Sequence, residues 1–504
     1  MTADRQGTGH GRREKKLADA TGEAAPRRAR DLTQGPITRT LLAFALPTLG
    51  SNVLQSLNGS VNSIWVGRFL GEGAIAATTN ANLIMFLMFS LAFGFGMAAT
   101  ILVGQSMGSG DMRQARRVIG TASGLFAFTS VAIALLGWLF APNLLRVLAT
   151  PPEAQAMALA YLRVIFLSLP PMFLGMLMTM GMRGMGDAMT PLLLMLLSVI
   201  LDAGLNPLLI AGIGPFPRMG IAGSATATLI ANYAVLGAGL LYVYVRDLPI
   251  RLRGSELGFL LPDPRLLRAI FVKGLPMGLH MLLFTFSGLV MVGLVNRAGV
   301  NVTAAYGIAQ QLWTYVQMPA MAIGTAVSAM AAQNIGAKRW DRVDAVTRSG
   351  VATNIVMTTI MVGLILIFDR PIFALFVGNG SPVIQIARHI QLIGTWSFII
   401  FGVTLVIFST VRANGAVYPP LLILLMSVVV GRVGFAVVLL PHYGTDVLWW
   451  SFPVGSAVSL GLGLIYYRFG NWRRQGLIDA FAEEEAAELS YATAEPGGRL
   501  SPNG

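Results

Sequence analysis

The chain has 504 residues, of which 55% are hydrophobic and only 12% are charged, and its mean hydropathy is +0.67. A soluble chain would carry about twice that share of charge, so the composition indicates a polytopic membrane protein. The absence of cysteine excludes disulfides, thiolate metal sites and a cysteine nucleophile, and the net charge of +13 reflects loops and the N-terminal tail more than a nucleic-acid surface.

A polar, basic tail opens the chain over residues 1–37 and shows no signal peptide. We expect it to be disordered and cytoplasmic, with basic clusters that either contact anionic lipids or simply orient the chain.

Spans of about 20 or more mostly apolar residues follow. There are twelve, near 41–66, 75–103, 118–140, 157–182, 191–213, 221–245, 271–295, 303–332, 346–368, 386–411, 418–440 and 447–467. The sequence predicts an all-α membrane protein.

Three amides recur on one face of the first span. Gln55, Asn58 and Asn62 are spaced i, i+3, i+7, as residues on one side of a helix are. They either form hydrogen bonds between helices or line a polar cavity.

An acid lies in the middle of the fifth span, in the run LSVILDAGLNPLLI from Leu197. Only Val, Ile, Leu, Ala and Gly lie within three places of Asp202. Asn206 follows one helical turn later, and Pro207 removes the backbone hydrogen bond to Ala203. Ionisable side chains at membrane depth are costly, so we interpret Asp202 as a carrier of a proton or a sodium ion. The alternative is a structural acid that pairs with an arginine or caps broken backbone near Pro207.

The connections alternate in basic charge along the chain. By the positive-inside rule, this alternation places both termini in the cytoplasm, and the even number of spans agrees. The cytoplasmic side holds the N-terminal tail, Arg113, Arg116, Arg117, Arg183, Arg246, Arg251, Arg253, Arg265, Arg268, Lys273, Lys338, Arg339, Arg342, Arg412, Arg473 and Arg474; the opposite side holds mainly Arg68, Arg146, Arg218, Arg297 and Arg370.

A connection at 247–270 divides the chain into lobes 38–246 and 271–470, followed by a cytoplasmic tail at 471–504. The lobes resemble each other: Gln105 aligns with Gln333 and Gly108 with Gly336, an offset of 228 residues. Six spans separate the copies, and an even number gives a parallel repeat about an axis along the membrane normal. Two such six-helix bundles enclose a central cavity, which is the architecture of alternating access. We interpret the repeated glutamines and glycines as hinge and capping residues.

A polar and aromatic group occupies two spans of the second lobe. It comprises His280, Tyr306, Gln310, Trp313, Tyr315 and Gln317. Aromatic faces attract organic cations, and the alternative is an interfacial aromatic belt with ordinary core. His280 is either a second proton site or a satisfied polar residue. Arg163 and Arg432 also lie inside spans, without partners that the sequence identifies.

The ordered motifs resemble the multidrug and toxic-compound extrusion (MATE) family, in its prokaryotic DinF-like branch. They are VNSIWVGRFLG from Val61, VGQSMGSGD from Val103, RGMGDAMTP from Arg183, NPLLI from Asn206, GIAGSATAT from Gly220, PAMAIGTAVSAMAAQNIGAKRWDR from Pro319 and RANGAVYPP from Arg412. They cover nearly all of residues 38–470. The resemblance implies an antiporter that exports organic cations or other amphipathic compounds in exchange for H⁺ or Na⁺.

The resemblance also implies a coupling site in the first lobe. The family's acids fall on Asn62 and Asn206 here, and the acid has moved one turn along the helix to Asp202. Thr228 is a further candidate ligand for the coupling ion. Gln55, Asn58, Tyr161 and Thr179 match other polar positions of the family's site and are assigned to the substrate cavity. The other main branch has a glutamate near Phe284, where this chain has no acid. With His280, Tyr306 and Gln310, Phe284 is assigned to the substrate cavity.

We therefore predict a monomeric, proton-coupled exporter of drug-like compounds in the plasma (inner) membrane, in contact with lipids and not with nucleic acid. It needs no cofactor besides the coupling ion. No nucleotide-binding loop, metal cluster or nucleophile–base set indicates an enzyme. Three alternatives stay open: sodium coupling, a flippase for lipid-linked precursors, which would need a strongly basic cavity, and a receptor or scaffold that transports nothing.

Overall fold

The computed structural model describes residues 31–147, 152–378 and 380–474. The first lobe comprises α2 (Ile37–Leu70), α3 (Glu72–Ser109), α4 (Met112–Val147), α5 (Pro152–Leu167), α6 (Leu169–Gly184), α7 (Met189–Ala211) and α8 (Ile221–Val245). A 3₁₀ turn, η1 (Gly254–Leu260), lies in the central connection. The second lobe comprises α9 (Pro264–Asn296), α10 (Val300–Gly336), α11 (Trp340–Ile367), α12 (Asp369–Val377), α13 (Val383–Gly394), α14 (Ser397–Ala413), α15 (Tyr418–Met426), the π-helix η2 (Ser427–Gly434), α16 (Phe435–Tyr443), α17 (Asp446–Phe469) and η3 (Asn471–Arg474).

The predicted all-α membrane fold is confirmed. Within the described ranges, eight helical spans are long and apolar enough to cross a membrane, and two bent helix pairs raise that number to ten. The pairs bend by 48° between α5 and α6, where Pro170 and Pro171 cannot donate backbone hydrogen bonds, and by 43° between α13 and α14. The long helices α2 and α10, which carry polar side chains toward the interior, complete the twelve crossings.

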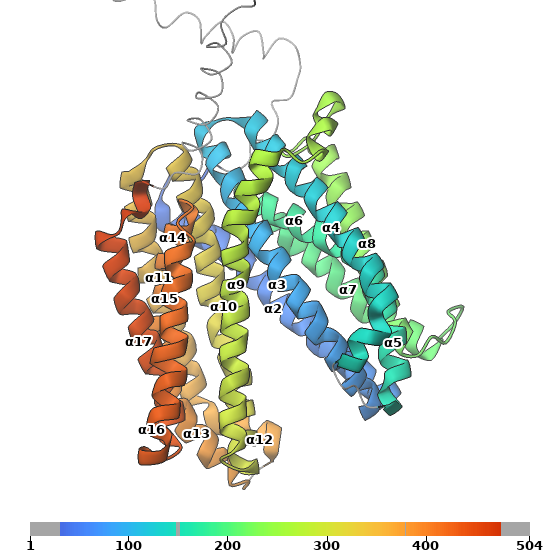
Figure 1. Cartoon of the computed structure of the whole chain (residues 1–504), viewed down its shortest axis with the longest axis vertical. Helices are drawn as coiled ribbons and strands as arrows, with labels where there is room; N and C mark the ends of the chain where they lie inside the picture. The colour runs from blue at the N-terminus through green and yellow to red at the C-terminus, as the bar shows by residue number, and fades with distance from the viewer. Residues whose placement is uncertain (1–30, 148–151, 379, 475–504) are drawn as a thin grey trace, which may run out of the picture.

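The two lobes meet through equivalent helices. In Figure 1 the lobes lie close together at one end and diverge toward the other. Helix α3 packs against α9, and α2 packs against α10, as a two-fold repeat requires. Helix α3 can approach α9 closely because Gly94 faces glycine backbone: a Cβ atom there would lie 2.4 Å from the carbonyl oxygen of Gly274.

The repeated glutamine–glycine motifs hold the lobes together where they lie close. We call this region, around Gln105, Gly108, Gln333 and Gly336, the closed end. A Cβ atom on Gly108 would lie 1.9 Å from the carbonyl oxygen of Gln333, and one on Gly336 would lie 1.9 Å from that of Gln105. Each motif therefore packs against the backbone of the other lobe, so we interpret these residues as capping contacts between the lobes as well as within them.

Each of these glutamines also binds the last turn of a helix in the other lobe. The Gln105 amide donates to the carbonyl of Ala413 at 2.6 Å, and the Gln333 amide donates to the carbonyl of Gly184 at 2.9 Å. Carbonyls at a helix end lack partners within the helix, so these bonds satisfy groups that would otherwise be buried and unpaired.

Residues 31–36, which the sequence assigned to the tail, lie against the second lobe. Leu32 is fully buried, its N–H donates to Gln333 Oε1 at 3.0 Å, and its carbonyl accepts from Asn334. Arg339 and Arg342 donate to the carbonyls of Thr33 and Gly35. The hydrogen bonds and the hydrophobic burial of Leu32 together hold this segment against the second lobe. The rest of that predicted tail, 1–30, lies outside the described residues.

The last described residues pack at the same end. Trp472 is buried, and its carbonyl accepts a hydrogen bond of 2.7 Å from Asn414. Residues 471–474 are therefore part of the fold, whereas the remainder of the predicted tail, 475–504, lies outside the described residues. Both ends of the described chain meet at the closed end.

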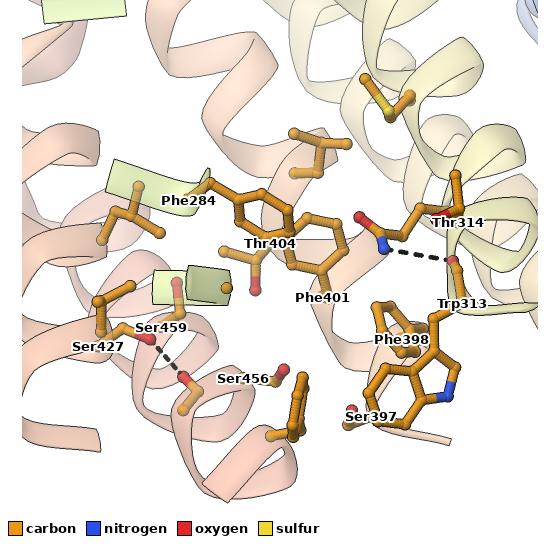
Figure 2. Close-up of a pocket in the computed structure, with 18 of the residues that line it drawn as sticks. Phe284, Trp313, Thr314, Ser397, Phe398, Phe401, Thr404, Ser427, Ser456 and Ser459 are labelled. Carbon is orange, nitrogen blue, oxygen red and sulfur yellow. Dashed lines mark hydrogen bonds between the residues drawn. The ribbon is translucent and has the colours of Figure 1, made fainter. Parts of the chain in front are cut away.

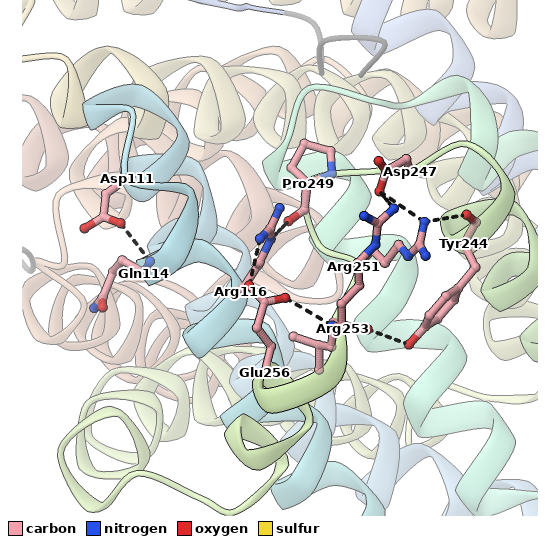
Figure 3. Close-up of polar contacts among 10 residues, drawn as sticks. Asp111, Gln114, Arg116, Tyr244, Asp247, Pro249, Arg251, Arg253 and Glu256 are labelled. Atoms are coloured by element: carbon pink, nitrogen blue, oxygen red, sulfur yellow. Dashed lines mark hydrogen bonds and ion pairs between the residues drawn. The ribbon is translucent and has the colours of Figure 1, made fainter. Parts of the chain in front are cut away.

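The central connection is held by an ion pair to α4 and by ion pairs within the connection itself (Figure 3). Arg116 donates to Glu256 at 2.7 Å and to the carbonyl of Pro249, and Arg251 and Arg253 both bind Asp247. Slight burial opposes ionisation of Glu256, but the hydrogen bond from Arg116 holds the pKa of that carboxyl below its usual value.

The second lobe begins earlier than the sequence indicated. Residues 264–270, predicted as linker, form the first turns of α9. Asp263 accepts the backbone N–H of Arg265 at 2.9 Å, and Pro264 starts the helix. An acidic N-cap followed by proline is a strong helix start, and this pair explains the shift.

Candidate functional site

The close packing of α7 and α8 brings a hydroxyl to the buried acid. The start of α8 is rich in small residues, and a Cβ atom on Gly223 would lie 2.5 Å from the carbonyl oxygen of Leu209. This close approach carries Thr228 to Asp202, where the Thr228 hydroxyl donates to Oδ1 at 2.9 Å. Asp202 is only 2% exposed. A carboxyl group and its donor are thus fixed in the interior of the first lobe.

Helices α2 and α5 add further polar groups to this site. The Asn58 amide is placed to donate to the Asp202 carboxyl group. The Asn62 carbonyl accepts from the hydroxyl of Ser224 at 2.7 Å, and the Asn62 side chain also interacts with the Tyr161 hydroxyl. We call Asp202, Thr228, Asn58, Asn62 and Tyr161 the Asp202 cluster. Its members come from four helices, so its geometry depends on how the lobe is packed.

Asn206 contacts its own helix. Its amide donates to the backbone carbonyl of Asp202 at 2.9 Å, and the side chain is fully buried. Pro207 lies within α7 without breaking it. The Asn206 Oδ1 and Asn58 Oδ1 atoms are buried and accept no hydrogen bond within the described part of the chain. Buried acceptors usually have a hydrogen-bond donor as partner. These two oxygens are therefore available to accept a hydrogen bond or to bind a cation.

Asp202 has no ion pair among the described residues, which contradicts a structural pairing with arginine in this state. Every other acid in residues 38–246 lies in a loop or at a helix start. A charged carboxylate without a cation is costly inside a membrane, whereas a protonated one is not. The surroundings of Asp202 therefore suit a group that changes its protonation.

A separate cavity of about 530 Å³ lies between the second lobe and α2 (Figure 2). Figure 2 shows Phe284, Trp313, Phe398 and Phe401 gathered around it. His280, Tyr306 and Gln310 also line it, so all four residues that the sequence assigned to the substrate cavity in this lobe meet there. A concave site with an aromatic wall and a few polar groups is the usual form of a site for an amphipathic molecule.

The aromatic wall is held in place by hydrogen bonds behind it. The indole N–H of Trp313 donates to Gln391 Oε1 at 3.0 Å and to Thr395 Oγ1 at 2.9 Å. The rings of Trp313 and Phe452 lie 4.6 Å apart, and Tyr306 stacks on Trp449. These partners restrict the ring positions, so the cavity keeps a defined shape.

The four first-lobe residues that the sequence assigned to the substrate cavity lie in different places: Asn58 and Tyr161 lie near Asp202 and Asn62, whereas Gln55 and Thr179 have other neighbours. Gln55 lines the second-lobe cavity together with Asn52 and Ser56 of α2. It lies three residues before Asn58, about 4.5 Å along the helix. Thr179 donates to the carbonyl of Met176 on its own helix.

The sequence identified no partners for Arg163 and Arg432, and the structure shows what surrounds both side chains. Arg163 lies over the ring of Trp138 at 4.9 Å, whereas Arg432 lines the second-lobe cavity from the π-helix η2. The π-helix was not predicted, because periodicity does not distinguish one wide turn inside an apolar run. No cluster of three or more His, Cys, Asp or Glu side chains that could hold a metal occurs in the ranges that the structure describes.

Comparison with known proteins places the chain in a family. The MatE family model matches it twice, over residues 47–208 and 276–438, which agrees with the internal repeat. The chain is 34% identical to the probable multidrug resistance protein YoeA of Bacillus subtilis, over 87% of this chain and 95% of that protein. It is 24% identical to the probable multidrug resistance protein NorM of Thermotoga maritima, over 88% and 94% of the two chains.

A solved structure of a multidrug resistance MATE family transporter in an outward-facing conformation shares the fold. Its TM-score is 0.81 at 19% identity, with 88% of this chain and 98% of that chain covered. The fold has the two bundles of six helices that the repeat predicts. The match to the family model covers most of the chain, and the relatives are transporters and not enzymes. The chain belongs to the MATE family and is a multi-pass multidrug efflux transporter.

Proposed function

We propose that this transporter exports cationic or other amphipathic compounds in exchange for protons, by alternating access, with Asp202 as the proton carrier. The observation that carries this proposal is an acid 2% exposed, without an ion pair in the described chain, that accepts a hydrogen bond from Thr228. When Asp202 is protonated, its new O–H can donate to a neighbouring amide oxygen. When it is ionised, Thr228 and Asn58 stabilise the charge.

Alternating access requires the closed end to separate while the opposite end closes. The basic connections at Arg113, Arg251 and Lys338 lie at the closed end together with both ends of the described chain. The positive-inside rule supports placing this end in the cytoplasm of the plasma membrane. In that orientation the present state faces outward. We further propose that a single chain, in contact with lipid and not with nucleic acid, performs the transport.

Sodium coupling is the second candidate, and one observation favours it. The unpartnered oxygens of Asn58 and Asn206 lie in the same lobe as the Asp202 carboxyl group, and oxygen atoms are the ligands that hard cations prefer. A lipid-linked precursor flippase is less well supported. Such a substrate carries several phosphate charges, and among the described residues Arg432 is the one arginine or lysine that lines the cavity.

Thr228→Val is expected to slow drug efflux about tenfold, because the variant loses a hydrogen bond to a carboxylate. Thr228→Ser keeps the hydroxyl and should transport at close to the wild-type rate. The measurement is efflux of a fluorescent fluoroquinolone, an aromatic zwitterion, from proteoliposomes. Thr226→Val is the matched control, since the Thr226 hydroxyl bonds to Ala222 on its own helix. Equal loss in both valine variants would contradict a role for the Thr228–Asp202 bond.

His280→Gln tests whether the second lobe carries the proton instead. If Asp202 is the carrier, this variant should still concentrate the fluoroquinolone against a gradient when a pH difference is imposed, within about threefold of wild type. His280 lines the cavity, so substrate affinity is measured in parallel by tryptophan fluorescence. Retained binding with complete loss of pH-driven transport would assign the coupling proton to His280.

A further inference from the structure

Among the described residues that line the second-lobe cavity, one is strongly basic and none is acidic. Of the side chains that line it, Arg432 carries the permanent charge and His280 is the other ionisable base, and neither Asp nor Glu is among them. The described acids of this lobe lie at its ends, where Asp344 pairs with Arg473, Asp369 with Arg388 and Asp446 with His389; Asp341 begins α11. The cavity is therefore electropositive.

Arg432 has no anionic partner within the described residues. Its guanidinium lies 3.8 Å from the ring centre of Phe452. The Nε atom is buried and makes no hydrogen bond in the described chain. The guanidinium interacts with the hydroxyl oxygen of Tyr306, which leaves the hydroxyl proton of Tyr306 free to be donated. A guanidinium offers five donors in a planar fork that fits carboxylate, sulfonate or phosphate. Among the described residues Arg432 therefore has the Tyr306 hydroxyl as a neighbour but no carboxylate, and its buried Nε donor is unpaired.

The backbone that carries Arg432 into the cavity has an unusual helical geometry. Arg432 belongs to the π-helix η2, and π-turns inside α-helices are rare and concentrate at functional sites. The Ser427 hydroxyl anchors the turn by donating to the carbonyl of Gly455 at 2.6 Å, a bond visible in Figure 2. Gly455 leaves room for the arginine, because a Cβ atom there would lie 3.3 Å from Arg432 Cβ.

We infer that the second-lobe cavity binds the anionic group of an aromatic, amphipathic substrate, with the Arg432 guanidinium as its partner and the Tyr306 hydroxyl as a second donor. The ring system of the substrate would lie against Phe284, Trp313, Phe398 and Phe401. A cation is disfavoured there, since Arg432 already occupies the face of Phe452 and repels a second positive charge. The inference rests on the proposed export function only for the fate of the bound molecule, and binding itself needs no gradient.

The test is equilibrium binding to the purified transporter in nanodiscs, with no gradient imposed. The probes are 2-naphthylacetate, its uncharged amide 2-naphthylacetamide, and the (2-naphthylmethyl)trimethylammonium ion, measured by calorimetry. A charge-assisted hydrogen bond predicts that wild type binds the carboxylate about 10- to 100-fold more tightly than the amide. Arg432→Gln should abolish that preference, and Arg432→Lys should keep part of it because the charge remains but the fork is lost.

Arg163→Gln is the matched control. Arg163 also lies within a span, covers an aromatic ring and has a buried, unpaired Nε, but it is in the first lobe and does not line the cavity. It should keep the preference of wild type for the carboxylate. A preference of wild type for the cation, or a carboxylate preference that survives Arg432→Gln, would overturn the inference.

The outcome can be separated from that of the proposed function. Asp202→Asn is outside the cavity and should retain the carboxylate preference while proton coupling is lost. If pH-driven transport depends on Asp202 but binding shows no charge preference, only the present inference fails. If the carboxylate preference depends on Arg432 but transport does not respond to the pH gradient, proton coupling is contradicted and the anion site is supported.

Discussion

Asp202→Asn is expected to reduce pH-driven drug efflux at least about 100-fold, which corresponds to about 2.7 kcal/mol. The amide has nearly the shape of the carboxyl group and can still accept the bond from Thr228, which now measures 2.9 Å. It cannot bind and release a proton near neutral pH. The lobe should therefore fold as before, and only the link between the proton gradient and transport should be lost.

Three measurements separate this loss from a structural defect. Efflux of the fluoroquinolone against its gradient should disappear, drug binding should stay within about threefold of wild type, and the melting temperature should change by less than about 4 °C. Asp446→Asn is the matched control, since that acid pairs with His389 at the surface of the second lobe. A variant at position 202 that still responds to the pH gradient would remove Asp202 from the mechanism.

Gly336→Ala and Gly108→Ala are each expected to prevent the closed end from forming. Alanine normally stabilises a helix relative to glycine by about 1 kcal/mol. Here its Cβ would lie 1.9 Å from a backbone oxygen of the other lobe, and backbone atoms cannot move away cheaply. Overpacking of this kind typically costs about 1–3 kcal/mol, which shifts the balance between conformations about 5- to 150-fold away from this state.

Electron-spin distances between labels at Arg113→Cys and Asp341→Cys would report this shift. The chain has no native cysteine, so the labelling pair needs no background substitutions. Both positions are exposed and lie next to the closed end, one in each lobe. The distance should lengthen in either glycine variant, and efflux should fall. Gly307→Ala on the same helix as Gly336 is the control, because nothing lies within 4 Å of its Cβ position. An unchanged distance would show that the contact is not required for closure.

The sequence was sufficient for the architecture because membrane spans are encoded locally. Long apolar runs, basic loops and the repeat from Gln105 to Gln333 predicted the twelve crossings and the two lobes. Helix ends were harder to place. Leu32 and Trp472 are single apolar residues within polar segments, and only contacts with distant helices show that they are buried.

The candidate site was predictable in part. Asp202 stands out in sequence because an acid in an apolar run is rare, and the family resemblance added Thr228, Asn58, Asn62 and Tyr161. The structure brings these five together.

The remaining assignments needed the packing of the helices. Gln55 shares a helical face with Asn58, but it lies nearer the closed end and meets a different neighbour. The place of Arg432 was also not predicted, because the π-helix that carries it contacts α17, where Ser427 bonds to Gly455, 28 residues further along the chain. Contacts between residues so far apart in the sequence do not alter the local pattern of hydrophobic residues, so that pattern cannot predict them.

The most direct test of proton-coupled export uses the purified transporter in proteoliposomes, with a pH gradient and a sodium gradient imposed separately. Transport of the fluoroquinolone should be driven uphill by the pH gradient in sodium-free buffer, should stop when the gradient is collapsed, and should be absent in Asp202→Asn. Uphill transport driven by sodium alone, with no response to the pH gradient, would contradict proton coupling and assign the site at Asp202 to Na⁺.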